Sequence, residues 1–218
     1  MIAVETNTRS PARMSSRPAL EIRFEFVDGS RETFIQENAE MAENIRNGIH
    51  PALLFSQSRI VVADDYSKSV FVCAQINRVD LIFQGSDFSG IPPDHLDLVE
   101  LTEAEFRQCV PVNDPALLQK REHPREVGDL LVSFLDLRMR GGSHVYLMNE
   151  IVVKLPAENQ SFMQRLLSKG TYTIRLREGG HGLLNLQNLI GYTVYPGVPE
   201  LPADTWMADS KGVYETLP

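Results

Sequence analysis

The chain has 218 residues, enough for one large domain or two small ones, and its 43% hydrophobic residues are sufficient to build a buried core. Its net charge of −8 lies mostly in the first half, and a surface of that sign repels phosphate backbones, which disfavours broad nucleic-acid binding. Cys73 and Cys109 have no disulfide-framework or metal-ligand spacing, and no apolar run approaches about 18 residues, so we expect a cytoplasmic protein without a membrane-spanning helix.

Residues 1–18 contain no apolar run of the length that an exported leader needs, so they are expected to form a disordered tail. The following stretch, LEIRFEFVDGSRETFIQ, alternates apolar and charged residues around an Asp-Gly pair, which predicts a β-hairpin with a tight turn. Asn38 can cap a short helix. The β-rich runs SRIVVADDY and SVFVCAQI then predict a second hairpin, and INRVDLIF predicts a closing strand. Residues 19–85 are therefore expected to form a first small β domain.

Residues 86–128 form a connector with a predicted helix in TEAEFRQCV, where Thr102 and Glu105 match a capping box. Residues 129–197 are expected to form a second small β domain with the same order of elements. It begins with LLVSFLDLRMR, a Gly-Gly turn and HVYLMNEIVV, continues with a short helix after Pro156, and ends with TYTIRLR and LNLQNLIGYTVY.

Residues 198–218 form a proline-rich C-terminal extension, in which Trp206 is expected to dock against a barrel or a partner. Each β unit has the order strand, strand, helix, strand, strand, strand. The predicted fold class is therefore α+β and β-dominated, with two tandem small antiparallel β-barrel-like domains related by duplication.

A short framework occurs in both units, as INRVDLI at residues 76–82 and LNLQNLI at residues 184–190. Short Asn and Asp side chains can bond nearby backbone amides, which suits a turn between two strands of a small barrel. The predicted structural turn residues are Asn77, Asp80, Asn185 and Asn188. Because the two units are expected to be separate domains, replacing the first Asn of each copy should have additive effects.

The order hairpin, short helix, hairpin, aliphatic-Asn and Leu-Ile resembles a family of small uncharacterised bacterial β domains, present here as two tandem copies. More distantly, YLMNEIVV is similar to the Met-Asn part of the first Sm signature, and LNLQNLIGY to the strand-turn-strand of the second, so each copy resembles an Sm-like or SH3-like small barrel. An RNA-binding Sm protein would have an Asp before Met148-Asn149 and an Arg-Gly near Leu186-Gln187, and this chain has neither. The resemblance therefore implies an architecture and no binding residues.

No motif in the sequence assigns a catalytic, cofactor-binding or metal-ligating residue, and no cofactor is expected. The histidines are not paired at the spacing of a helical metal site. Asp28 and Asp64-Asp65 lie in predicted turns, where Asp is favoured for local hydrogen bonding. The stretch RMRGGSHV lacks the lysine and the strand-to-helix context of a phosphate-binding loop.

The sequence favours a non-catalytic protein-interaction or assembly module that binds a protein partner or associates with itself. The first alternative is an Sm-like nucleic-acid-binding protein, in which the phosphate contacts would come from Arg138 and Arg140 and from the tail residues Arg9, Arg13 and Arg17. The second alternative is an enzyme with a site at the domain junction, where His144 and His181 could converge.

Overall fold

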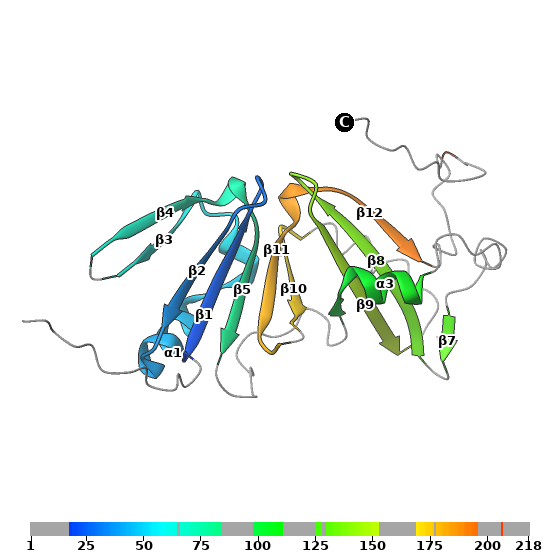
Figure 1. The fold of residues 1–218 in the computed structure, drawn as a ribbon, viewed down its shortest axis with the longest axis horizontal. Helices are drawn as coiled ribbons and strands as arrows, with labels where there is room; N and C mark the ends of the chain where they lie inside the picture. Colours follow the sequence, from blue (N-terminus) through cyan, green and yellow to red (C-terminus); the bar gives the residue numbers. More distant parts are fainter. Residues whose placement is uncertain are drawn as a thin grey trace, which may run out of the picture.

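The computed structural model describes residues 18–64, 66–83, 98–110, 125–127, 130–152, 169–176, 178–195 and 206. The strands are β1 (Leu20–Phe26), β2 (Arg31–Gln36), β3 (Arg59–Ala63), β4 (Lys68–Val72), β5 (Ile76–Phe83), β6 (Leu98–Leu101), β7 (Arg125–Val127), β8 (Leu130–Met139), β9 (His144–Val152), β10 (Thr171–Arg175), β11 (His181–Asn185) and β12 (Leu189–Tyr195). The helices are α1 (Ala39–Gly48), α2 (Pro51–Leu54), α3 (Glu103–Cys109) and the 3₁₀ turns η1 (Cys73–Gln75) and η2 (Leu186–Asn188). The fold is β-dominated, as the sequence predicted (Figure 1).

Ten of these strands form one sheet, in the order β12-β8-β9-β6-β10-β11-β5-β1-β2 with β7 beside β8, and β3 and β4 form a second, two-stranded sheet. This arrangement differs from the predicted pair of barrel-like domains, because the large sheet runs through both halves and no barrel closes among the described strands. The physical reason is that β11 of the second half satisfies the backbone groups along an edge of β5 in the first half.

The first half comprises β1 to β5 with α1 and α2. Its β1–β2 hairpin turns at Gly29, whose φ of +82° suits glycine. Phe71 of β4 packs against Phe24, Phe26 and Phe34, with ring centroids 4.8 to 5.8 Å apart, and so anchors the β3–β4 hairpin to the core. The predicted cap of α1 is confirmed, since the Asn38 side chain accepts a hydrogen bond from the Met41 amide at 3.1 Å.

The second half comprises β8 to β12, and its core contains Leu135, Leu137, Leu147 and Tyr172. The predicted helix after Pro156 lies outside the described residues, as do residues 1–17. The Trp206 side chain is 96% exposed, so it does not dock against the described strands, and docking against a partner stays a prediction. None of the helices in the described residues is long and apolar enough to cross a membrane.

The connector contributes a strand that the sequence did not predict. β6 lies between β9, to which it is antiparallel, and β10, to which it is parallel at Val99 and Arg175. The predicted capping box of α3 is confirmed, because Thr102 and Glu105 each satisfy a backbone amide of the other. The helix places Phe106 in a small core with Phe134, so the connector is an integral part of the second half.

The second half repeats the strand pairings of the first half at one constant shift along the chain, the shift that carries Ser30 onto Ser143, and we call it the repeat offset. β8 pairs with β9 and β12 as β1 pairs with β2 and β5, and both strand pairs end in a register shift next to the 3₁₀ turn. β4 corresponds to β11 at the repeat offset, and its hairpin partner β3 corresponds to β10 at a shift one residue smaller. Three backbone hydrogen bonds also recur at the repeat offset. In the first half they run from Phe26 N to Ser30 O, from Gly29 N to Phe26 O and from Val27 N to Gln75 O. Their counterparts in the second half run, in the same order, from Met139 N to Ser143 O, from Gly142 N to Met139 O and from Arg140 N to Asn188 O.

Candidate functional site

The two halves meet where β11 is added to β5, and we call this ladder with the contacts beside it the joint. Its antiparallel pairs are His181 with Leu81, Gly182 with Asp80, Leu183 with Val79 and Leu184 with Arg78. Successive side chains of a strand point to opposite faces. Leu183 is accordingly buried in the core of the first half, whereas Leu184 is buried in the core of the second half. One side chain of the second half thus completes the core of the first.

Two asparagines of the second half bind the 3₁₀ turn of the first half. Asn185 Nδ2 donates to the carbonyl oxygens of Cys73 at 3.1 Å and Ile76 at 2.9 Å. Asn188 Nδ2 donates to those of Ala74 at 3.2 Å and Ile76 at 2.9 Å. Both side chains are buried, and they occupy carbonyl groups at the end of η1 that would otherwise be costly to bury.

Asn185 is also the N-cap residue of η2, where its side-chain oxygen accepts a hydrogen bond from the Gln187 amide at 3.2 Å. Asn188 is the last residue of that turn. The sequence placed both residues at a turn of their own unit, and the contacts that cross to the first half were not foreseen.

Asn77 and Asp80 lie inside strand β5 and not in the turn that the sequence predicted. Asn77 is buried, and its Nδ2 donates to the Arg140 carbonyl oxygen at 2.7 Å in the β8–β9 turn. Its side chain therefore links the two halves. The prediction differs from the structure because the Leu-Ile framework matches by residue type, while in the first half the turn η1 precedes the Asn.

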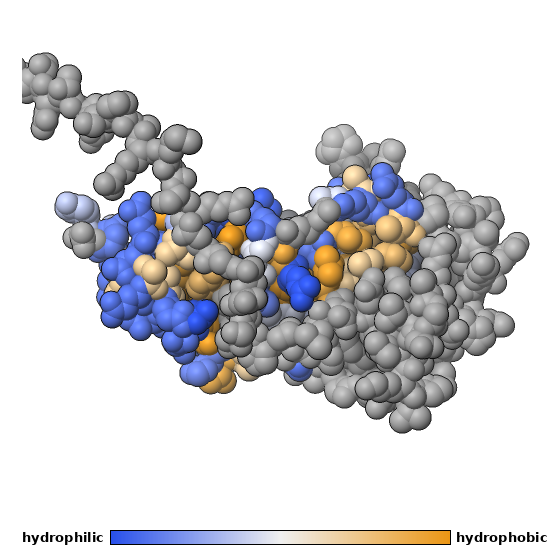
Figure 2. Space-filling model, turned by 90° about the horizontal axis from the view of Figure 1, so that it is seen from below, coloured by the Kyte–Doolittle hydropathy of each residue, from blue (hydrophilic) through white to orange (hydrophobic). Residues whose placement is uncertain are grey.

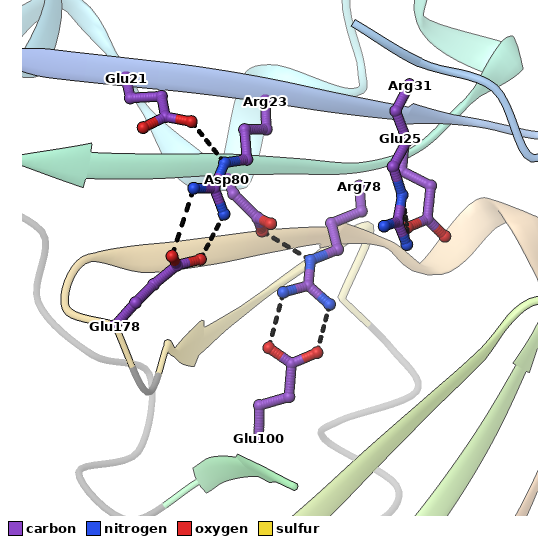
Figure 3. Close-up of polar contacts among 8 residues, drawn as sticks. All are labelled: Glu21, Arg23, Glu25, Arg31, Arg78, Asp80, Glu100 and Glu178. Carbon is purple, nitrogen blue, oxygen red and sulfur yellow. Dashed lines mark hydrogen bonds and ion pairs between the residues drawn. The ribbon is translucent and has the colours of Figure 1, made fainter. Parts of the chain in front are cut away.

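An ion-pair cluster lies beside the joint (Figure 3). Arg78 Nε donates to Asp80 at 2.6 Å, and its two terminal nitrogens donate to both carboxylate oxygens of Glu100, at 2.5 and 2.7 Å. Because Arg78 belongs to β5 and Glu100 to β6, this bidentate pair links the first half to the connector strand. Viewed from below, hydrophilic surface separates two hydrophobic areas near the middle of the molecule (Figure 2).

The buried position of Arg78 and Asp80 shifts their pKa values. Burial alone would lower the pKa of Arg78, but the hydrogen bonds and charges of Glu100 and Asp80 outweigh burial and hold the pKa above its ordinary value. Burial raises the pKa of Asp80, and the Arg78 charge offsets only part of that shift. A second pair, Arg23 with Glu178, joins β1 to the β10–β11 turn at a more exposed position.

Glycines of the second half allow its turns to approach the first half closely. A Cβ atom at Gly141 would lie 1.6 Å from the Val27 carbonyl oxygen, and one at Gly180 would lie 2.2 Å from the Leu81 carbonyl oxygen. Both distances are far below van der Waals contact, so a side chain at either position would force the halves apart.

Arg138 and Arg140 lie at the end of β8 and in the turn after it, and both are exposed. The backbone of Arg140 is part of the joint, since its amide donates to the Asn188 carbonyl at 2.8 Å and its own carbonyl accepts from Asn77. Arg9, Arg13 and Arg17 lie outside the described residues.

His144 and His181 are at opposite ends of the joint. His144 follows Ser143, which lies beside Asn77, whereas His181 pairs with Leu81, four residues or about 13 Å further along β5. His144 Nδ1 contacts Asp136 at 2.6 Å, and burial lowers the pKa of His181. In the described part of the chain, no group of three or more His, Cys, Asp or Glu side chains could hold a metal ion.

The sequence did contain a signal for the correct alignment of the halves. Gly29-Ser30 and Gly142-Ser143 form equivalent turns and are related by the repeat offset. The stretches INRVDLI and LNLQNLI are separated by a smaller shift, and they match residues on opposite sides of the 3₁₀ turn. Comparisons with family models, curated proteins and solved structures gave no match to this chain.

Proposed function

We propose that this protein is a non-catalytic interaction or assembly module, built from a duplicated β unit, that binds its partner by strand addition. The observation that carries the proposal is the joint itself. There, the second half already binds the first half by adding strand β11 to β5 and inserting Leu183 into the core of the first half. A unit that associates in this way inside the chain is suited to do the same with a second protein.

The proposed duplication rests on the pairings and turn hydrogen bonds that recur at the repeat offset. Each unit combines two hairpins, a 3₁₀ turn and a last strand that pairs with the first. This arrangement supports the resemblance to small Sm-like and SH3-like domains, here fused edge to edge. Cys73 and Cys109 are both free thiols, which suits the cytoplasmic location that we propose.

Among the described strands, β2, β3, β4, β7 and β12 each pair on one side only, and we propose that the partner binds at β4 and β12. The outward face of the β3–β4 hairpin consists of Val61, Val70 and Val72, which are 52%, 47% and 51% exposed. Neighbouring exposed valines next to an open strand edge are typical of an interaction surface. We name these three residues the valine face.

Affinity purification from the native host tests the proposal, with wild type compared with Val70→Lys on the valine face and Ile190→Lys on β12. The matched control is Ile35→Lys on β2, where the replaced side chain is 62% exposed, as Ile190 is 65% exposed. We expect a protein that is recovered with wild type and with Ile35→Lys to be lost with one of the two edge variants. Identical recovery with all four proteins would contradict the proposal.

A titration with single-stranded RNA addresses the nucleic-acid alternative. Micromolar binding that weakens steeply between about 50 and 200 mM salt would favour phosphate contacts by Arg138 and Arg140. The interaction proposal expects no such binding, because the chain is acidic.

A further inference from the structure

We propose that the partner is a second copy of this chain, and that β4 of one copy adds to β12 of the next, so that the joint inside the chain is repeated between chains. This inference rests on the proposed function and names the partner of the same edges. It follows from the correspondence of the halves, since β4 is the counterpart of β11 and β12 is the counterpart of β5.

The first line of support is the valine face. Its counterparts in the second half, matched by strand pairing, are Thr173, Leu183 and Asn185, which are all buried, at 3%, 0% and 0% exposure. Phe71, which points the other way, packs in the core of its own half, as its counterpart Leu184 does. The first half therefore carries the docking strand with the same inward and outward alternation, but its outward side chains are uncovered.

The second line of support is the outer surface of β12. In the first half, Val79, Leu81 and Asn77 are buried where β11 and the β8–β9 turn cover β5. Their counterparts on β12 are Tyr192, Val194 and Ile190, of which the first two are partly exposed and Ile190 is 65% exposed. The receiving strand thus keeps an apolar surface where the internal joint would place a partner.

The two edges lie toward opposite ends of the molecule, with β4 at one end of the long axis and β12 toward the other (Figure 1). A copy that donates β4 at one end can therefore receive β4 at the other. Such head-to-tail contacts generate a closed ring or an open chain of copies.

The internal joint specifies the register between copies. His181, Gly182, Leu183 and Leu184 pair with Leu81, Asp80, Val79 and Arg78, and the repeat offset converts these pairs into intermolecular ones. The proposed pairs are Lys68 with Val194, Ser69 with Thr193, Val70 with Tyr192 and Phe71 with Gly191. Val70 then packs between Tyr192 and Val194, as Leu183 packs between Val79 and Leu81.

The contact between copies is weaker than the internal joint, because side chains stand where the joint has glycines. Ser67 and Asp28 replace Gly180 and Gly141, whose missing Cβ atoms allow the closest approaches. Ser69 replaces Gly182, where a Cβ would meet Asp80 Oδ1 at 2.9 Å, but the residue opposite Ser69 is the shorter Thr193. The association should therefore be reversible and depend on protein concentration.

Sedimentation equilibrium of the purified full chain tests the inference. We expect the mass of wild type and of Ile35→Lys to rise above 24.5 kDa with concentration, while Val70→Lys and Ile190→Lys each remain monomeric. An equimolar mixture of Val70→Lys and Ile190→Lys should form a dimer and nothing larger, because β4 of the second variant can dock on β12 of the first. Circular dichroism of each variant checks that it is folded.

The register is tested by disulfide formation between two proteins that each carry one introduced cysteine, with the exposed Cys109 changed to Ser and the buried Cys73 kept. Ser69→Cys mixed with Thr193→Cys should cross-link, whereas Lys68→Cys with Thr193→Cys, slipped by one residue, should not. A monomeric wild type, or a mixture of the two lysine variants that remains monomeric, would overturn the inference. The interaction proposal would survive a monomeric wild type if a different protein were lost with the edge variants.

Discussion

The hydrogen bonds that cross the joint should be energetically coupled, and Asn185 and Asn188 provide the sharpest test. Asn185→Ala removes two donated bonds and the cap of η2, while Asn188→Ala removes two donated bonds. At a net value of about 1 kcal/mol for each bond, the two variants should lose roughly 3 and 2 kcal/mol of unfolding free energy. The carbonyl of Ile76 accepts from both side chains and keeps one donor in each single variant.

The double variant leaves that buried carbonyl without either donor, so it should lose about 1 kcal/mol more than the sum of the single variants. Urea unfolding with an unchanged slope measures all three free energies. The control is Asn38→Ala, which removes the exposed cap of α1, should cost about 1 kcal/mol and should be additive with Asn185→Ala. Strict additivity of Asn185→Ala and Asn188→Ala would refute the reasoning.

Asn77 and Asn185 should also be coupled, in contrast to the expectation from the sequence. The sequence predicted additive effects, because it placed these residues in separate domains. In the structure Asn77 follows Ile76, whose carbonyl binds Asn185, and its own amide binds the other half. We therefore expect Asn77→Ala and Asn185→Ala to be coupled as well, in the same unfolding assay.

Three further outcomes are expected. Gly141→Ala should lower the unfolding free energy by more than about 2 kcal/mol, because its Cβ would overlap the Val27 carbonyl. Gly142→Ala has open space around it and should cost only the roughly 1 kcal/mol that comes from its positive φ. Thermal denaturation compares the two variants. Arg78→Met should lower the unfolding free energy by about 3 to 5 kcal/mol, because it leaves the carboxylates of Asp80 and Glu100 buried without their partner. Arg31→Met breaks an exposed pair and should lower it by under about 1 kcal/mol. Urea unfolding measures both values. Burial, and then the charge of a neighbouring arginine, lowers the pKa of His181, so the unfolded chain binds the proton more readily than the folded chain. The stability of the wild type is therefore full above the ordinary histidine pKa of about 6.5 and falls as the pH drops through that value. His181→Gln should lose less stability than wild type between about pH 7.5 and 5.5.

The elements that the sequence predicted well depend on residues close together in the chain. The first hairpin follows from the alternation around Asp28-Gly29, and the start of α3 follows from Thr102 and Glu105, which satisfy each other's amides. In each case the side chains that determine the structure lie within a few residues of the backbone that they organise.

The joint could not be predicted in this way, because its partners are far apart in the chain. Nothing in the stretch HGLLN indicates that Leu183 belongs to a core whose other members all come from the first half. The short strand β6 and the pairing of Arg78 with Glu100 likewise depend on where the connector returns to the sheet. A glycine that is required for close approach, such as Gly180, is in sequence indistinguishable from an ordinary turn glycine.

The mismatch between the two possible repeat spacings has a physical explanation. Strand pairing and turn hydrogen bonds use backbone groups, so they recur at the repeat offset although the side chains there differ. Asn77 corresponds to Ile190, and Leu183 corresponds to Val70. In each pair, one residue is buried in the joint and the other faces outward. Positions whose burial differs between the halves carry different side chains. Turn residues such as Gly29 and Gly142, which have the same backbone role in both halves, are alike. The spacing of turn glycines is therefore a better guide to the alignment of the two halves than a match among polar side chains at the joint.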